Sequence, residues 1–124
     1  MIEVPVGYGE LVDKITILRI KVRRIADPAR RAHAAKELDL LTRRWEATGL
    51  GWPTETDDLE AVNEELWDVE DLLRRLEAAS DFGPEFVRLA RAVYVTNDRR
   101  AALKRAVNEG LGSEIVEVKD YVKY

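Results

Sequence analysis

The chain has 124 residues, of which 46% are hydrophobic and 35% are charged, and its formal net charge is −4. This length corresponds to one domain that can bury a core without covalent staples. The absence of cysteine excludes disulfides, thiolate metal ligands and a thiol nucleophile, and the acidic excess offers no global attraction for nucleic acid or an anionic membrane.

No stretch approaches the ~18 consecutive apolar residues that a membrane-spanning helix needs. The first nine residues also lack the basic start and long apolar run of a signal peptide. We therefore expect a cytoplasmic protein with no membrane span and no nucleic-acid partner.

The first residues, Ile2 to Val6, alternate between apolar and other residues and predict an extended segment, which Pro5 limits to an edge. A helix is predicted from about residue 9 to residue 26. Its apolar residues follow spacings of four, three, four and three between Leu11 and Ile25. That spacing is typical of a helix that packs against another helix.

The dipeptide Asp27-Pro28 predicts a sharp start for a second helix, since Asp caps helices and Pro suits their first position. This helix is expected to end near residue 48, where a Gly-rich break leads to Pro53. A third helix is predicted over residues 57–79, with an apolar seam from Leu59 to Leu76.

The fourth helix is predicted to begin at Pro84 and to end near residue 109, with Gly110 as its stop. The apolar residues of the tail, 113–124, suggest a short two-stranded pairing with residues 2–6. Together these elements predict one all-α domain over residues 1–124, an antiparallel bundle of about four helices.

The fourth helix carries polar residues where its apolar rows continue. The row that begins with Phe86 and Val93 meets Asn97, Arg100 and Lys104. A second row passes through Val87, Arg91, Tyr94, Asp98, Ala101, Arg105 and Asn108. Because an unpaired buried polar group costs about 1–3 kcal/mol, these side chains need partners. They either line a pocket or form an internal hydrogen-bond network, and both readings stay open.

If such residues converge, their cations could clamp the phosphate or carboxylate of a small anionic ligand, for example a phosphorylated or sugar-nucleotide-like compound. The alternative is internal ion pairing, for which Glu70 and Arg74 have the right spacing within one helix. The residues of this predicted ligand site are Lys14, Lys21, Asn63, Glu70, Arg74, Arg91, Tyr94, Asn97, Asp98, Arg100 and Lys104.

Two acidic pairs suggest a metal site. Glu10 and Asp13, like Glu65 and Asp68, are three residues apart and share a helix face, so two such helices could hold Mg²⁺ through carboxylate oxygens. A helix start or a solvated face explains the same carboxylates more simply. An enzyme remains the rival class: an Mg-dependent pyrophosphohydrolase-like protein, or a chorismate-mutase-like one in which cations act without metal. The catalytic residues of such an enzyme are unknown.

Several strings resemble a family of small all-helical bacterial proteins of unknown function. They run from Tyr8 to Leu18, Asn63 to Asp71, Asp81 to Phe86, Ala90 to Arg100, and Gly112 to Glu114. The resemblance implies an association with glycosyltransferase-type proteins of surface-polysaccharide synthesis, but no activity and no catalytic residue. The chain departs from the family pattern at Arg19, where an acidic residue is usual. A homodimer and a glycosyltransferase-type partner both stay open.

Overall fold

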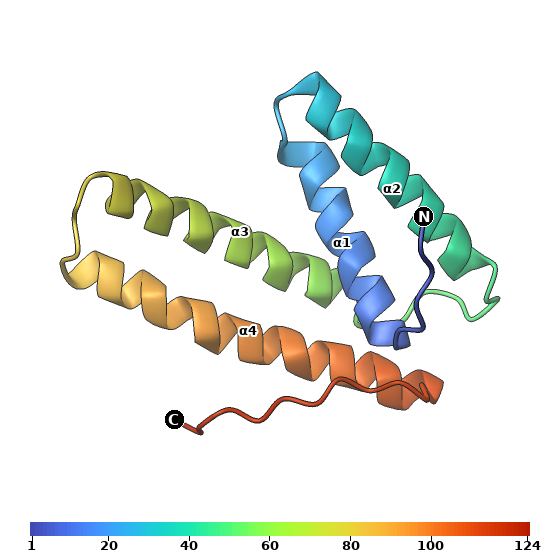
Figure 1. The fold of residues 1–124 in the computed structure, drawn as a ribbon. Coiled ribbons are helices and arrows are strands. Elements are labelled where there is room, and N and C mark those ends of the chain that lie inside the picture. The colour runs from blue at the N-terminus through green and yellow to red at the C-terminus, as the bar shows by residue number, and fades with distance from the viewer.

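The computed structural model describes residues 1–124 and shows four helices joined by short turns (Figure 1). They are α1 (Tyr8–Arg24), α2 (Pro28–Glu46), α3 (Thr56–Ala78) and α4 (Pro84–Leu111). The all-α prediction is confirmed, and the bounds agree with the predicted ones to within two residues. No helix is both long and apolar enough to cross a membrane.

Local capping explains where the helices begin and end. The Asp27 carboxylate accepts a hydrogen bond from the Arg30 amide at 3.0 Å, and Pro28 occupies the first position of α2. Gly112, with a φ of 68°, ends α4 in the left-handed conformation that favours glycine. The stop predicted at Gly110 was therefore misplaced, since that residue lies within the helix.

The helices form two hairpins, α1 with α2 and α3 with α4 (Figure 1). Only α1 packs against all three other helices. The core lies where the two hairpins meet, around Val12, Ile15, Trp45, Leu59 and Val107. The central helix of the fold is thus α1, whereas the sequence placed most of the predicted polar site on α4.

The terminal segments do not form the β pairing that their alternating residues suggested, because they follow different helices. Glu3 forms an ion pair with Arg44 of α2 at 2.6 Å, whereas the tail returns along α4 (Figure 1). At the end of the tail, the ring of Tyr124 lies 5.1 Å from that of Tyr94. No residue is in a strand.

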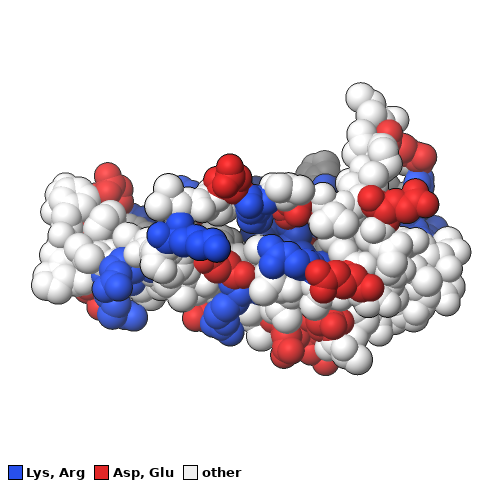
Figure 2. Space-filling model, turned by 90° about the horizontal axis from the view of Figure 1, so that it is seen from below, with Lys and Arg blue, Asp and Glu red and all other residues white.

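Seen from below, basic and acidic side chains are interspersed over the molecule (Figure 2). This face therefore has no broad patch of one charge.

Candidate functional site

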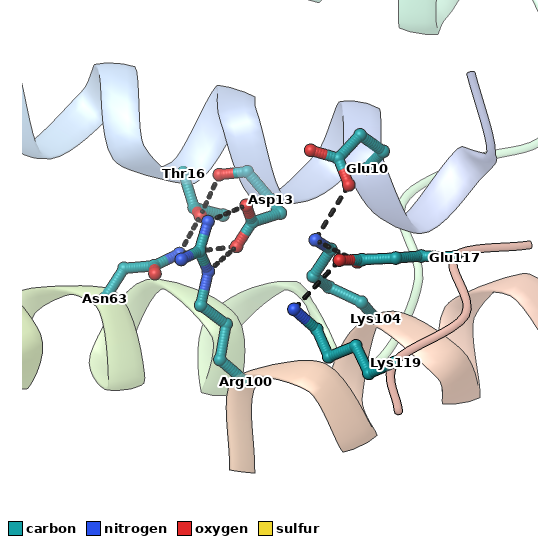
Figure 3. A network of polar contacts seen from close by, with 8 residues as sticks. All are labelled: Glu10, Asp13, Thr16, Asn63, Arg100, Lys104, Glu117 and Lys119. Atoms are coloured by element: carbon teal, nitrogen blue, oxygen red, sulfur yellow. Dashed lines mark hydrogen bonds and ion pairs between the residues drawn. The ribbon is translucent and has the colours of Figure 1, made fainter. Parts of the chain in front are cut away.

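A buried polar network joins three helices around Asp13 of α1 (Figure 3). Asp13 is 1% exposed. Arg100 of α4 donates to it twice, from Nε to Oδ1 at 2.8 Å and from a terminal nitrogen to Oδ2 at 2.6 Å. Asn63 of α3 donates to Oδ1 at 2.9 Å. The hydrogen bonds to Asp13 are the main reason why the pKa of Arg100 is raised.

Thr16 completes this network one turn along α1. Its hydroxyl donates to the Asp13 carbonyl at 2.7 Å and accepts from the Asn63 amide at 3.0 Å. The network contains no buried side-chain nitrogen or oxygen without a partner; the only such atom in the protein is Oε1 of Glu60. The network is therefore satisfied internally and leaves no group aimed at a ligand.

A second cluster surrounds Lys104 of α4, which is 8% exposed (Figure 3). Its Nζ lies 2.7 Å from Glu10 of α1 and 2.8 Å from Glu117 of the tail, and Lys119 also contacts Glu117 at 2.9 Å. Burial favours a lower pKa for Lys104, but hydrogen bonds to the two carboxylates outweigh it and the pKa is raised. Hydrogen bonds from Lys104, and then from Lys119, lower the pKa of Glu117 to about 2.

Close backbone contact fixes the start of α1 against α4. The Gly9 amide donates to Oδ1 of Asn108 at 2.8 Å, and a Cβ at residue 9 would clash with the Lys104 carbonyl oxygen. Sequence reasoning did not assign Thr16, Asn108 or Glu117 to this site. Two signals were available: Thr16 follows Asp13 by one helical turn, and Asn108 ends the second polar row of the fourth helix.

Three of the eleven residues predicted for the ligand site meet in these clusters, namely Asn63, Arg100 and Lys104. They form ion pairs and hydrogen bonds within the protein. This is the internal network that the sequence offered as the alternative to a ligand pocket. The cavity beside Lys104 holds only about 10 Å³ and is covered by Val116 and Glu117 of the tail. The structure shows no ligand pocket at this position.

The other predicted residues of α3 and α4 do not converge. The buried residues of α4 include Leu89, Thr96 and Val107. Asn97 lies next to this buried row and is not part of it. Tyr94 and Asp98 lie under Tyr124 of the tail, whose hydroxyl donates to the Asp98 carboxylate. The predicted residues that are exposed on these two helices are Glu70, Arg74, Arg91, Tyr94, Asn97 and Asp98.

The four carboxylates proposed as metal ligands do not come together either. Besides the pairs of Glu10 with Lys104 and Asp13 with Arg100, Glu65 lies 3.1 Å from Arg99 and Asp68 lies 2.6 Å from Arg24. No three His, Asp or Glu side chains lie together in a way that could hold a metal ion. The predicted Mg²⁺ site is not formed, because a basic side chain already neutralises each carboxylate.

A different cavity, of about 680 Å³, opens between the α1–α2 turn and Trp67 of α3. We call it the cleft. Its residues are Leu18, Lys21, Ile25, Ala26, Asp27, Arg30, His33, Ala34, Glu37 and Trp67. Lys21 is the one predicted ligand residue that lines it; Lys14 instead pairs with Glu37 at 3.1 Å.

The cleft contains charges of both signs. Its Glu37 pairs with Lys14, and its Asp27 accepts a hydrogen bond from the Arg30 backbone amide. Lys21 and Arg30, in contrast, have no carboxylate oxygen within 4.0 Å. The positive end of the α2 dipole lies at the same edge. The ring of Trp67 provides an aromatic surface, with the Arg24 guanidinium 5.7 Å from its centroid.

Fold and cleft together define a small four-helix protein with a partly aromatic groove, lined by the unpaired cations Lys21 and Arg30, and a separate internal polar network. Residues 2–123 match the Family of unknown function (DUF6165), and the chain belongs to that family. No curated protein and no solved structure matches the chain.

Proposed function

We propose that the protein is a small helical binding protein that holds an anionic ligand in the cleft. The observation that carries this proposal is that Lys21 and Arg30 are unpaired beside Trp67 in a cavity of about 680 Å³. That volume falls within the range of roughly 300–1,000 Å³ that small-molecule sites occupy.

The chemistry of the cleft favours a ligand with two parts. A phosphate or carboxylate would be held by Lys21 and Arg30 near the start of α2, where arginine can bind two oxygens at once. A flat or apolar part would pack on Trp67, beside Leu18 and Ile25. A sugar nucleotide has both parts, and the family resemblance to proteins found beside glycosyltransferases supports this class. We therefore propose an accessory role in surface-polysaccharide synthesis in the cytoplasm.

Binding explains the cleft better than either enzyme hypothesis. The pyrophosphohydrolase-like reaction would need free carboxylates around Mg²⁺, and the acidic pairs predicted for it are occupied by basic side chains. The chorismate-mutase-like arrangement depended on arginine and lysine side chains that converge from three helices. The two that point inward from α4 are already paired, Arg100 with Asp13 and Lys104 with Glu10 and Glu117.

Calorimetry with inorganic phosphate, nucleotides and sugar nucleotides, each with and without Mg²⁺, tests the proposal. Arg30→Ala should weaken binding at least about tenfold, the value of one charge-assisted hydrogen bond. Arg31→Ala is the matched control, because Arg31 is an exposed neighbour that does not line the cleft. Absence of binding across the panel, or equal loss in both variants, would contradict the proposal.

A further inference from the structure

A second cavity, of about 400 Å³, lies beside the N-terminal segment, residues 1–6. This segment runs along the α1–α2 hairpin (Figure 1), and the ion pair of Glu3 with Arg44 holds it there. We call this cavity the apolar groove. Its apolar lining includes Ile2, Val4 and Val6 of the segment, Leu11 of α1, and Leu40 and Leu41 of α2. It shares a single residue, Glu37, with the cleft.

The cleft and the apolar groove are consecutive sections of one channel between α1 and α2. Along α1, the channel is lined by Leu11, Lys14, Leu18, Lys21 and Ile25. Because these residues follow one another at spacings of three and four, they lie on one side of the helix. The stripe spans about 21 Å at the rise of an α-helix. On α2, the matching stripe runs in the opposite direction through Arg44, Leu40, Glu37, His33 and Arg30.

The two sections of the channel differ in charge. In the apolar groove every charged side chain is paired: Glu3 with Arg44, Glu10 with Lys104, and Lys14 with Glu37. In the cleft, Lys21 and Arg30 are unpaired, and the carboxylate of Asp27 is bound to the start of α2. The channel therefore has free cations at one end and apolar surface at the other.

The passage between the two sections is spanned only by the ion pair of Lys14 with Glu37. The side chains of this pair are 56% and 43% exposed. Exposed ion pairs contribute little to stability, so a ligand can part this one at small cost. Beyond it, Ile2 is 91% exposed and Val4 is 67% exposed. Neighbouring exposed apolar side chains are typical of binding surfaces, and a chain lying in the groove would cover these two.

We propose that the channel binds an amphiphile with one apolar chain and an anionic head group, a phosphate or a carboxylate. The head group lies at Lys21 and Arg30, and the chain follows α1 past Lys14 into the apolar groove. Charge complementarity sets this orientation, because the groove has no unpaired charge to hold the head group. The inference rests on the anion site proposed above and names a further class of ligand for it.

Titrations followed by NMR, with ethyl phosphate and with octyl phosphate below its micelle concentration, test the chain. Octyl phosphate should bind at least about thirtyfold more tightly, since each buried methylene group contributes roughly fourfold in affinity. Octanoate is titrated beside it, and the tighter of the two octyl compounds identifies the head group. Equal binding of ethyl and octyl phosphate would overturn the inference and leave the groove to another occupant, such as a helix of another protein.

Two substitutions address the two ends of the channel separately. Val4→Glu places a carboxylate in the apolar groove and should remove most of the gain from the longer chain, with ethyl phosphate binding unchanged. Arg30→Ala should weaken both phosphates by the same factor. Val87→Glu is the matched control for Val4→Glu, because Val87 is 52% exposed on α4 and lines neither cavity.

The outcomes separate this inference from the proposed function. If neither phosphate binds, the anion site fails and the inference fails with it. If both phosphates bind and Val4→Glu and Val87→Glu affect octyl phosphate equally, the chain does not enter the apolar groove, and only the inference is overturned.

Discussion

Arg100 and Asp13 are 87 residues apart in the chain and are joined by two hydrogen bonds, which fasten α4 to α1. Asp13 has nearly no contact with solvent, so the only hydrogen-bond donors to its carboxylate are Arg100 and Asn63. Asn63 and Arg100, which the sequence suggested for ligand binding, therefore contribute to the stability of the fold. Asn97, in the same predicted row, is exposed.

We predict that Arg100→Met lowers the free energy of unfolding by about 3–5 kcal/mol, because it leaves the buried Asp13 carboxylate without its cation. Asn97→Leu should change stability by no more than about 0.5 kcal/mol. Urea denaturation of the two single variants measures both values. Adding Asp13→Asn to Arg100→Met removes the stranded charge and should recover part of the loss. Equal effects at residues 97 and 100 would show that the network is not the source of stability.

Gly9 gives a prediction about backbone contact. Gly9→Ala should destabilise the fold by about 1–3 kcal/mol, because the new methyl group would clash with the Lys104 carbonyl oxygen. Gly110→Ala is the control, since a Cβ at that helical position would meet nothing within 4 Å. It should be neutral or stabilise the protein by up to about 1 kcal/mol through helix propensity. The melting temperatures of the two variants measure these effects. A Gly9→Ala variant as stable as the wild-type protein would argue against the close contact of α1 with α4.

The tail should detach in acid. The pKa of Glu117 is lowered from 4.5 to about 2 by Lys104 and Lys119, so the folded state favours the ionised form. Its stabilising effect is present above pH 4.5 and is lost as the pH falls through about 2. We expect the carboxyl NMR signal of Glu117 to titrate near pH 2, with loss of the Tyr94–Tyr124 contact. Glu117→Gln should loosen the tail at neutral pH and abolish this dependence. A Glu117 carboxyl that titrates near pH 4.5 in the wild-type protein would contradict this prediction.

Trp67 should report on ligand binding, because its ring lines the cleft whereas Trp45 is buried in the core. We predict that a bound nucleotide or sugar nucleotide changes the tryptophan fluorescence and that Trp67→Phe removes this change. Trp52→Phe serves as the control, since Trp52 lies outside the cleft. A change that persists in Trp67→Phe would place the ligand elsewhere.

The sequence by itself determined the helices. Their starts depend on local chemistry, such as the capping carboxylate of Asp27 and the fixed backbone of Pro28 and Pro84, and their lengths follow from apolar residues at helical spacing. It also indicated that the polar residues Asn63, Arg100 and Lys104 need partners, because they adjoin apolar seams. These inferences succeeded because they concern neighbours along the chain.

Only the tertiary structure decided which side chains meet. Each helix has several adjacent rows, and a difference of one residue, such as Thr96 against Asn97, turns a side chain by about 100° and exposes or buries it. Asp13 looked like a metal ligand until Arg100 was placed beside it, and Lys21 became part of a cleft only because α3 brings Trp67 to the α1–α2 turn. Contacts between distant residues depend on how whole helices cross, which spacing within a single helix does not specify.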